Sequence, residues 1–138
     1  MSARDAAARL RALMVLLALW DTCIGVYAVL FPSHLERLLG PEPQGEPIFV
    51  RGVGAMWLFV AYIQLLAFRN PDKNACAIRL SVVFRLTEAA FCTAEALFLL
   101  GPPANTVRIV LAVFAVLNVF IAFITSQWLR LLRPEAEQ

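Results

Sequence analysis

The sequence has few of the residues on which most enzymes and metal proteins depend. It contains one histidine and three cysteines with no Cys-x-x-Cys pair, which argues against a structural zinc site and a disulfide-exchange centre. It also lacks a Walker phosphate loop, a Gly-x-Gly-x-x-Gly turn and a Ser-His-Asp set. The sequence therefore favours a non-catalytic protein with no metal and no cofactor.

Charged residues are scarce as well. Only 16% of the 138 residues are charged and 61% are hydrophobic, whereas a soluble domain has about 25% charged residues. A chain this short forms one domain at most, so its surplus apolar surface needs lipid. The net charge of +2 and the absence of a basic run interleaved with aromatics argue against nucleic-acid binding.

Long apolar segments are what the sequence has in excess. Crossing a hydrocarbon core of about 30 Å as a helix takes roughly 20 apolar residues. Four segments qualify, at 13–31, 48–68, 75–100 and 106–131. Because the connections are short, neighbouring helices must be antiparallel. We predict one all-α membrane domain over 1–138, an up-down-up-down four-helix bundle.

The longest connection contains a short helical pattern. Ser33 and Glu36 have the spacing of a capping box, and leucines follow before Gly40. This predicts a small interfacial helix over 34–39, which the three prolines of 41–47 prevent from continuing.

Basic residues are distributed unevenly between the two sides of the predicted bundle. Eight of the 12 lysines and arginines lie on the side of the termini and of the 70–74 turn. The positive-inside rule therefore predicts that both termini lie in the cytoplasm, and we expect the protein to lie in the inner membrane of the cell. The first apolar segment contains Asp21 and lacks a small-x-small cleavage site, so we expect a retained helix rather than a signal peptide.

Ionisable residues inside the apolar segments are the candidate functional residues. In segment 75–100, a spacing of three and four positions puts one polar stripe on a single helix face; it consists of Ser81, Arg85, Glu88, Cys92 and Glu95. A charge near the bilayer centre costs about 2.5 to 3.5 kcal/mol on insertion scales. The stripe must therefore face the interior of the bundle.

Residues of other helices reach the same depth as this stripe. Counting about 1.5 Å per residue from each membrane face places Asp21 and Asn118 near the midplane. We predict that Arg85 is shared there by Asp21 and Glu88, with Asn118 as a hydrogen-bonding neighbour. Asn118 is the only central strongly polar residue of 106–131, so most of that helix is expected to face lipid.

A second polar layer is predicted in the outer half of the membrane. Arg51 and Glu95 match in depth, which predicts an ion pair between the second and third long helices. The face that carries Arg51 has small residues that allow a neighbouring backbone to approach closely; its other members are Gly54, Ala55, Leu58 and Tyr62.

Two interpretations of these charges stay open. In the first, the charges pair with one another and fix the packing and register of the helices. In the second, they form a proton relay or a polar ligand pocket, because two buried carboxylates that share one arginine cannot both be fully compensated.

With the helices placed, the chain resembles the small bacterial four-helix membrane proteins called DoxX-like. The similarity lies in length, topology and the start of the second helix, Arg51-Gly52-Val53-Gly54-Ala55. Such families include accessory membrane subunits of quinone-linked oxidoreductases, so the resemblance implies a partner as much as a reaction. A fainter pattern, Arg51-x-x-Gly54 with Trp57 and with Glu95 followed by Gly101, is similar to the four-helix membrane scaffold of sterol C4-demethylation.

These observations favour an accessory or scaffold protein that binds another membrane protein, a second copy of the chain, or a lipid. An alternative from a different class is the binding or transport of a small amphipathic molecule, such as a quinone or a lipid, in a polar intramembrane pocket. A second alternative is a membrane oxidoreductase or isomerase in which Glu88 or Asp21 acts as general acid or base.

Overall fold

The structure is a computed structural model that describes residues 2–39, 47–99 and 105–132. Within these ranges every regular element is a helix and there is no strand, which confirms the predicted all-α class. The elements are α1 (Ala3–Leu30), α2 (Pro32–Leu39), α3 (Pro47–Arg69), α4 (Ala75–Ala94), the π-helical turn η1 (Glu95–Leu99) and α5 (Asn105–Leu131).

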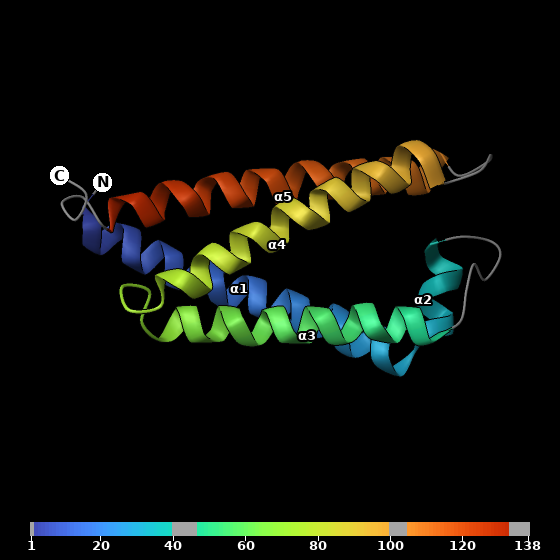
Figure 1. The fold of residues 1–138 in the computed structure, drawn as a ribbon, viewed down its shortest axis with the longest axis horizontal. Coiled ribbons are helices and arrows are strands. Elements are labelled where there is room, and N and C mark those ends of the chain that lie inside the picture. The colour runs from blue at the N-terminus through green and yellow to red at the C-terminus, as the bar shows by residue number, and fades with distance from the viewer. Residues whose placement is uncertain (1, 40–46, 100–104, 133–138) are drawn as a thin grey trace.

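The four long helices alternate in direction (Figure 1). Both chain ends lie at one end of the molecule, which we call the termini end, and α2 lies at the other, which we call the α2 end. Helix α1 packs along α3, and α4 packs along α5. Helices α3 and α4 meet at the tight turn between them and separate towards the α2 end, where α4 lies beside α5 (Figure 1).

Two predicted helix starts differ from the structure. Helix α1 begins at Ala3 instead of residue 13, because Ser2 and Asp5 form a capping box in which each backbone N–H donates to the other's side chain over 3.2 Å. The apolar pattern locates only the part of this helix long enough to cross a membrane. Residues 3–12, nearly three turns before it, are still helical, and Ala6 and Leu10 within them are fully buried.

Helix α2 begins at Pro32 rather than at residue 34. The carbonyl of Phe31 accepts hydrogen bonds from the backbone N–H groups of His34 and Leu35, both at 3.1 Å. Proline suits the first helical position because it has no N–H to leave unpaired. The predicted capping box between Ser33 and Glu36 is absent from the described hydrogen bonds, and the predicted end at Gly40 lies outside the described residues.

The other boundaries agree closely with the predicted segments 48–68, 75–100 and 106–131, except that the third long helix changes to a π-turn at Glu95. Residue 100 lies outside the described residues.

The helices are held together by different contacts at the two ends of the molecule. At the termini end, an apolar core joins all four long helices and consists of Leu10, Met14, Leu17, Ala67, Ala75, Ile78 and Leu129. Towards the α2 end, the backbones of α1 and α3 touch at two glycines. A Cβ atom added to Gly25 would lie 2.9 Å from the carbonyl oxygen of Gly54, and one added to Gly54 would lie 2.9 Å from that of Gly25.

The exterior of the helices is apolar. Large hydrophobic side chains are exposed on each long helix, including Leu16, Phe59, Leu86 and Val116. Three helices are long and apolar enough to cross a membrane: α1, residues Val50–Arg69 of α3, and residues Val107–Leu131 of α5. Helix α4 is not among them, since it carries Arg79, Arg85 and Glu88 within 20 residues.

Candidate functional site

A polar cluster lies in the middle of the bundle, between the apolar core at the termini end and the glycine contact. Every long helix contributes to it. We call it the central cluster; its members are Asp21 of α1, Trp57 and Gln64 of α3, Ser81, Arg85 and Glu88 of α4, and Asn118 of α5.

Arg85 is the hub of the central cluster. One of its terminal nitrogens, Nη2, donates to the carboxylate of Asp21. The other, Nη1, donates to Glu88 Oε2 at 2.9 Å and to Asn118 Oδ1 at 3.4 Å. The three contacts predicted for Arg85 near the midplane, with Asp21, Glu88 and Asn118, are therefore present, and Arg85 joins residues of α1, α4 and α5.

Helix periodicity explains how these side chains meet. Ser81, Arg85 and Ala89 are the buried positions in the middle of α4, spaced by four residues. Helix α5 presents a buried stripe at spacings of three and four that consists of Ala115, Asn118, Ala122, Thr125 and Leu129. Its small residues allow α4 to lie close, while its other faces expose Ile109, Val116, Phe120 and Phe123.

Thr125 is a polar residue of α5 that the sequence argument missed. Its side chain is 1% exposed, and its hydroxyl has no hydrogen-bond partner among the described residues.

Two members of the central cluster were also not predicted. Gln64 Nε2 donates to Asp21 Oδ2 at 2.8 Å and lies 3.4 Å from Ser81 Oγ. Trp57 Nε1 donates to Glu88 Oε1 at 3.2 Å. The sequence contains a pattern from which they could have been predicted. One face of α3 carries, at spacings of four and three residues, Trp57, Ala61 and Gln64.

The predicted outer ion pair between Arg51 and Glu95 is wrong. Among the described residues, Arg85 forms ion pairs with Asp21 and with Glu88, whereas Arg51 and Glu95 form none. Arg51 lies on α3 near α2 and is exposed, whereas Glu95 belongs to η1, which packs against α5. Equal depth did not bring them together because α3 and α4 separate towards the α2 end (Figure 1).

The face of α3 chosen around Arg51 is also only partly interior. Gly54 is buried and, with Leu58, meets Gly25 of α1. Ala55 and Tyr62 are exposed. The interior face of α3 is therefore rotated from the predicted one towards Trp57 and Gln64.

The charges of the central cluster do not balance in number, since two carboxylates face one guanidinium. Asp21 and Arg85 are almost fully buried, and the side chain of Glu88 is 17% exposed. Among the described residues, Gln64 Oε1 and Arg85 Nε have no hydrogen-bond partner. The arrangement can hold four helices in register, and it contains one carboxylate more than its arginine can neutralise.

Comparison with known proteins assigns no family to this arrangement: no family model matches the chain, and no curated protein or solved structure is significantly similar to it.

Proposed function

We propose that the chain is a small inner-membrane accessory or scaffold protein with four membrane-spanning helices and cytoplasmic termini. It acts by binding another membrane protein or a lipid, not by catalysis. The apolar exterior and the three apolar helices support the membrane location. The excess of basic residues at the termini end supports the orientation.

Helix α4 is the fourth span in this proposal despite its charges. Its two central ionisable groups do not need to face lipid, because Arg85 is 3% exposed and Glu88 is paired with it at 2.9 Å. Arg79 is near the termini end, where a long side chain can reach the headgroups. A helix with this distribution is compatible with a bilayer only when its neighbours supply the partners.

The observation that carries the non-catalytic proposal is the direct pairing inside the central cluster. Arg85 donates to three groups of the protein itself, and both oxygens of Glu88 accept hydrogen bonds from protein side chains. Groups that bind to one another in this way fix helix positions. Two surface hollows, each of about 370 Å³, are lined by described residues, and neither includes a member of the cluster.

Site-specific crosslinking at native expression would test the proposal. A photoreactive amino acid is placed at Val116, which is 69% exposed on α5, and as a control at Ala122, which is 2% exposed on the same helix. We expect Val116 to crosslink to one protein that also copurifies in mild detergent without crosslinking. A chain that stays monomeric and crosslinks only to lipid from exposed positions on all long helices would overturn the protein-partner form of the proposal.

The second candidate is a polar pocket for an amphipathic molecule such as a quinone or a lipid. The observation that favours it is the combination of a surplus carboxylate with two unpartnered buried atoms, Gln64 Oε1 and Arg85 Nε. The variant Glu88→Gln distinguishes the two candidate functions. A ligand site, or a membrane oxidoreductase or isomerase, would lose bound ligand or activity with this variant. A structural cluster would show altered stability alone.

A further inference from the structure

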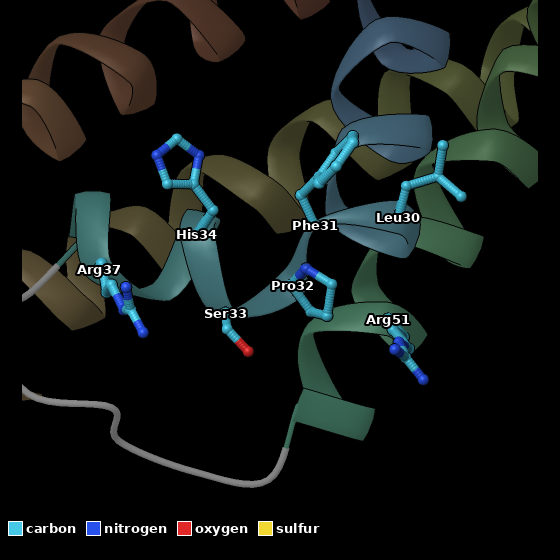
Figure 2. Close-up of a pocket in the computed structure, with 7 residues that line it drawn as sticks. All are labelled: Leu30, Phe31, Pro32, Ser33, His34, Arg37 and Arg51. Carbon is cyan, nitrogen blue, oxygen red and sulfur yellow. The ribbon is translucent and has the colours of Figure 1, made fainter.

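A hollow at the α2 end combines cationic and apolar groups. It lies where the end of α1, the helix α2 and the start of α3 meet, and it has a volume of about 370 Å³ (Figure 2). Its lining residues are Leu30, Phe31, Pro32, Ser33, His34, Arg37 and Arg51. Figure 2 shows the side chains of Ser33, Arg37 and Arg51 directed to the same side of α2 and α3.

The positive charge of this hollow is not neutralised within the part of the chain that the structure describes. Neither Arg37 nor Arg51 forms an ion pair there, and both side chains are exposed. Arg51 was expected to pair with Glu95, and the separation of α3 from α4 leaves it beside α2 instead. Basic residues are uncommon at this end of the molecule, because eight of the 12 lie at the termini end.

The other half of the hollow is apolar. Leu30 and Phe31 are 62% and 55% exposed where α1 ends. The hollow is therefore lined by a hydroxyl, two guanidinium groups and large hydrophobic side chains, and Figure 2 shows the side chains of Leu30 and Phe31 turned away from those of Ser33, Arg37 and Arg51. It lies at the level where two of the proposed membrane-spanning helices terminate. This is the level of lipid headgroups, so a ligand with an anionic group and an adjoining hydrocarbon chain matches both halves.

A contact between α1 and α2 holds the hollow in shape. The hydroxyl of Tyr27 is hydrogen-bonded to Nδ1 of His34, and their rings meet edge to face with centroids 5.7 Å apart. Tyr27 also packs against Phe31, at 5.6 Å between centroids. These contacts fix the start of α2, and with it Ser33 and Arg37, relative to α1.

We propose that this hollow binds the phosphate of an anionic phospholipid in the leaflet at the α2 end. Arg37 and Arg51 bind the phosphate oxygens, since guanidinium groups match phosphate geometry with paired N–H donors. The hydroxyl of Ser33 donates a further hydrogen bond, and the first part of an acyl chain lies against Leu30 and Phe31. The site is separate from the central cluster, and the proposal rests on the proposed membrane location but not on a protein partner.

Lipid binding to the purified full-length chain in a neutral detergent would test the proposal. Native mass spectrometry compares phosphatidylglycerol with phosphatidylcholine, which has the same phosphodiester but no net charge. We expect tighter binding of phosphatidylglycerol. Replacing both arginines, Arg37→Gln with Arg51→Gln, should weaken it about 30-fold, the loss expected from removing two basic groups near an anionic lipid.

The matched control is Arg69→Gln with Arg130→Gln, two exposed arginines at the termini end. This variant has the same net charge as the first and should bind phosphatidylglycerol as the unmodified chain does. Ser33→Asp is a second test, because Ser33 is exposed and the new carboxylate should repel the headgroup without affecting folding. Equal weakening by the two double variants, or no weakening by either Arg37→Gln with Arg51→Gln or Ser33→Asp, would overturn the proposal.

Glycerophosphoglycerol distinguishes a lipid from a soluble anion. It presents the same phosphodiester without hydrocarbon, so we expect it not to displace phosphatidylglycerol at equal concentration. Displacement at equal concentration would show that the hollow binds a soluble phosphate and would refute the lipid assignment.

Discussion

Arg85 in α4 and Asp21 in α1 are 64 positions apart in the sequence and form a buried ion pair in the middle of the bundle. Their contact connects the two halves of the molecule, because α1 packs along α3 and α4 packs along α5. Gln64 of α3 donates to the same carboxylate oxygen at 2.8 Å, and Asn118 of α5 accepts from Arg85. One carboxylate and one guanidinium therefore organise all four long helices.

Asp21→Asn should lower the free energy of unfolding by about 3 kcal/mol, because it leaves the buried Arg85 without one of its two opposite charges. The measurement is an unfolding titration in mixed micelles. In a double-mutant cycle with Arg85→Gln, the two losses should be much less than additive, since both variants remove one interaction. Additive losses would show that the ion pair does not couple the halves.

Thr125→Val is the matched control for the central cluster. Thr125 is as buried as Asp21, but its hydroxyl has no hydrogen-bond partner among the described residues. Replacing that hydroxyl with a methyl group should leave stability unchanged or raise it by about 1 kcal/mol. A loss as large as that of Asp21→Asn would mean that any polar change in the interior is damaging and that the cluster has no special role.

Gly54→Ala should destabilise the chain by about 1 to 3 kcal/mol, because the added Cβ would lie 2.8 Å from the Cβ of Ala28 and 2.9 Å from the carbonyl oxygen of Gly25. Gly52→Ala is the control on the same helix. A Cβ at Gly52 has no atom within 4 Å, so helix propensity alone predicts a gain of up to about 1 kcal/mol. Similar effects of the two variants on thermal stability would refute the backbone contact between α1 and α3.

The orientation proposed for the chain can be tested with single cysteines after Cys23, Cys76 and Cys92 are replaced by alanine. Asp72→Cys lies in the exposed turn at the termini end, and Ser33→Cys lies in exposed α2 at the other end. A membrane-impermeant maleimide added to spheroplasts should label Ser33→Cys at once and Asp72→Cys only after permeabilisation, as the distribution of arginines predicts. The reverse result would invert the topology.

Tyr27→Phe should loosen α2 and leave the rest of the bundle unaffected. It removes the hydrogen bond to His34, worth about 0.5 to 1.5 kcal/mol. Hydrogen exchange of the backbone amides of residues 33–39 should become faster while exchange in α4 stays the same. Tyr62→Phe is the matched control, since Tyr62 is 58% exposed; faster exchange in α2 with both variants would contradict a local role for Tyr27.

The contacts of Arg85 with Asp21, Glu88 and Asn118 could be predicted from the sequence because they depend on two regular quantities, helix periodicity and rise per residue. The cost of an unpaired charge in lipid then leaves few possible partners. Gln64 and Trp57 were not predicted because the face of α3 expected to point inward was chosen from the position of Arg51. A charge at the end of a helix can reach an interface, so it constrains rotation less than a polar residue at mid-depth.

The pairing of Arg51 with Glu95 failed for a different reason. Matching residues by depth assumes parallel neighbouring helices, whereas α3 and α4 diverge from their connecting turn. The divergence depends on lateral packing, such as the contact of Gly25 with Gly54 and the small-residue stripe of α5. A single sequence contains the residues for these contacts but does not state which helix each face meets.

The contact between Gly25 and Gly54 has a consequence for biogenesis. It is made entirely by the first two long helices, so a nascent chain has both of its members by residue 69, before Arg85 is synthesised. Under the proposed membrane location, the N-terminal hairpin can thus close in the bilayer with Asp21 and Gln64 already positioned. Arg85 of α4 would then enter the bilayer next to the carboxylate of Asp21, and this pairing would offset the cost of inserting a helix that carries three charged residues.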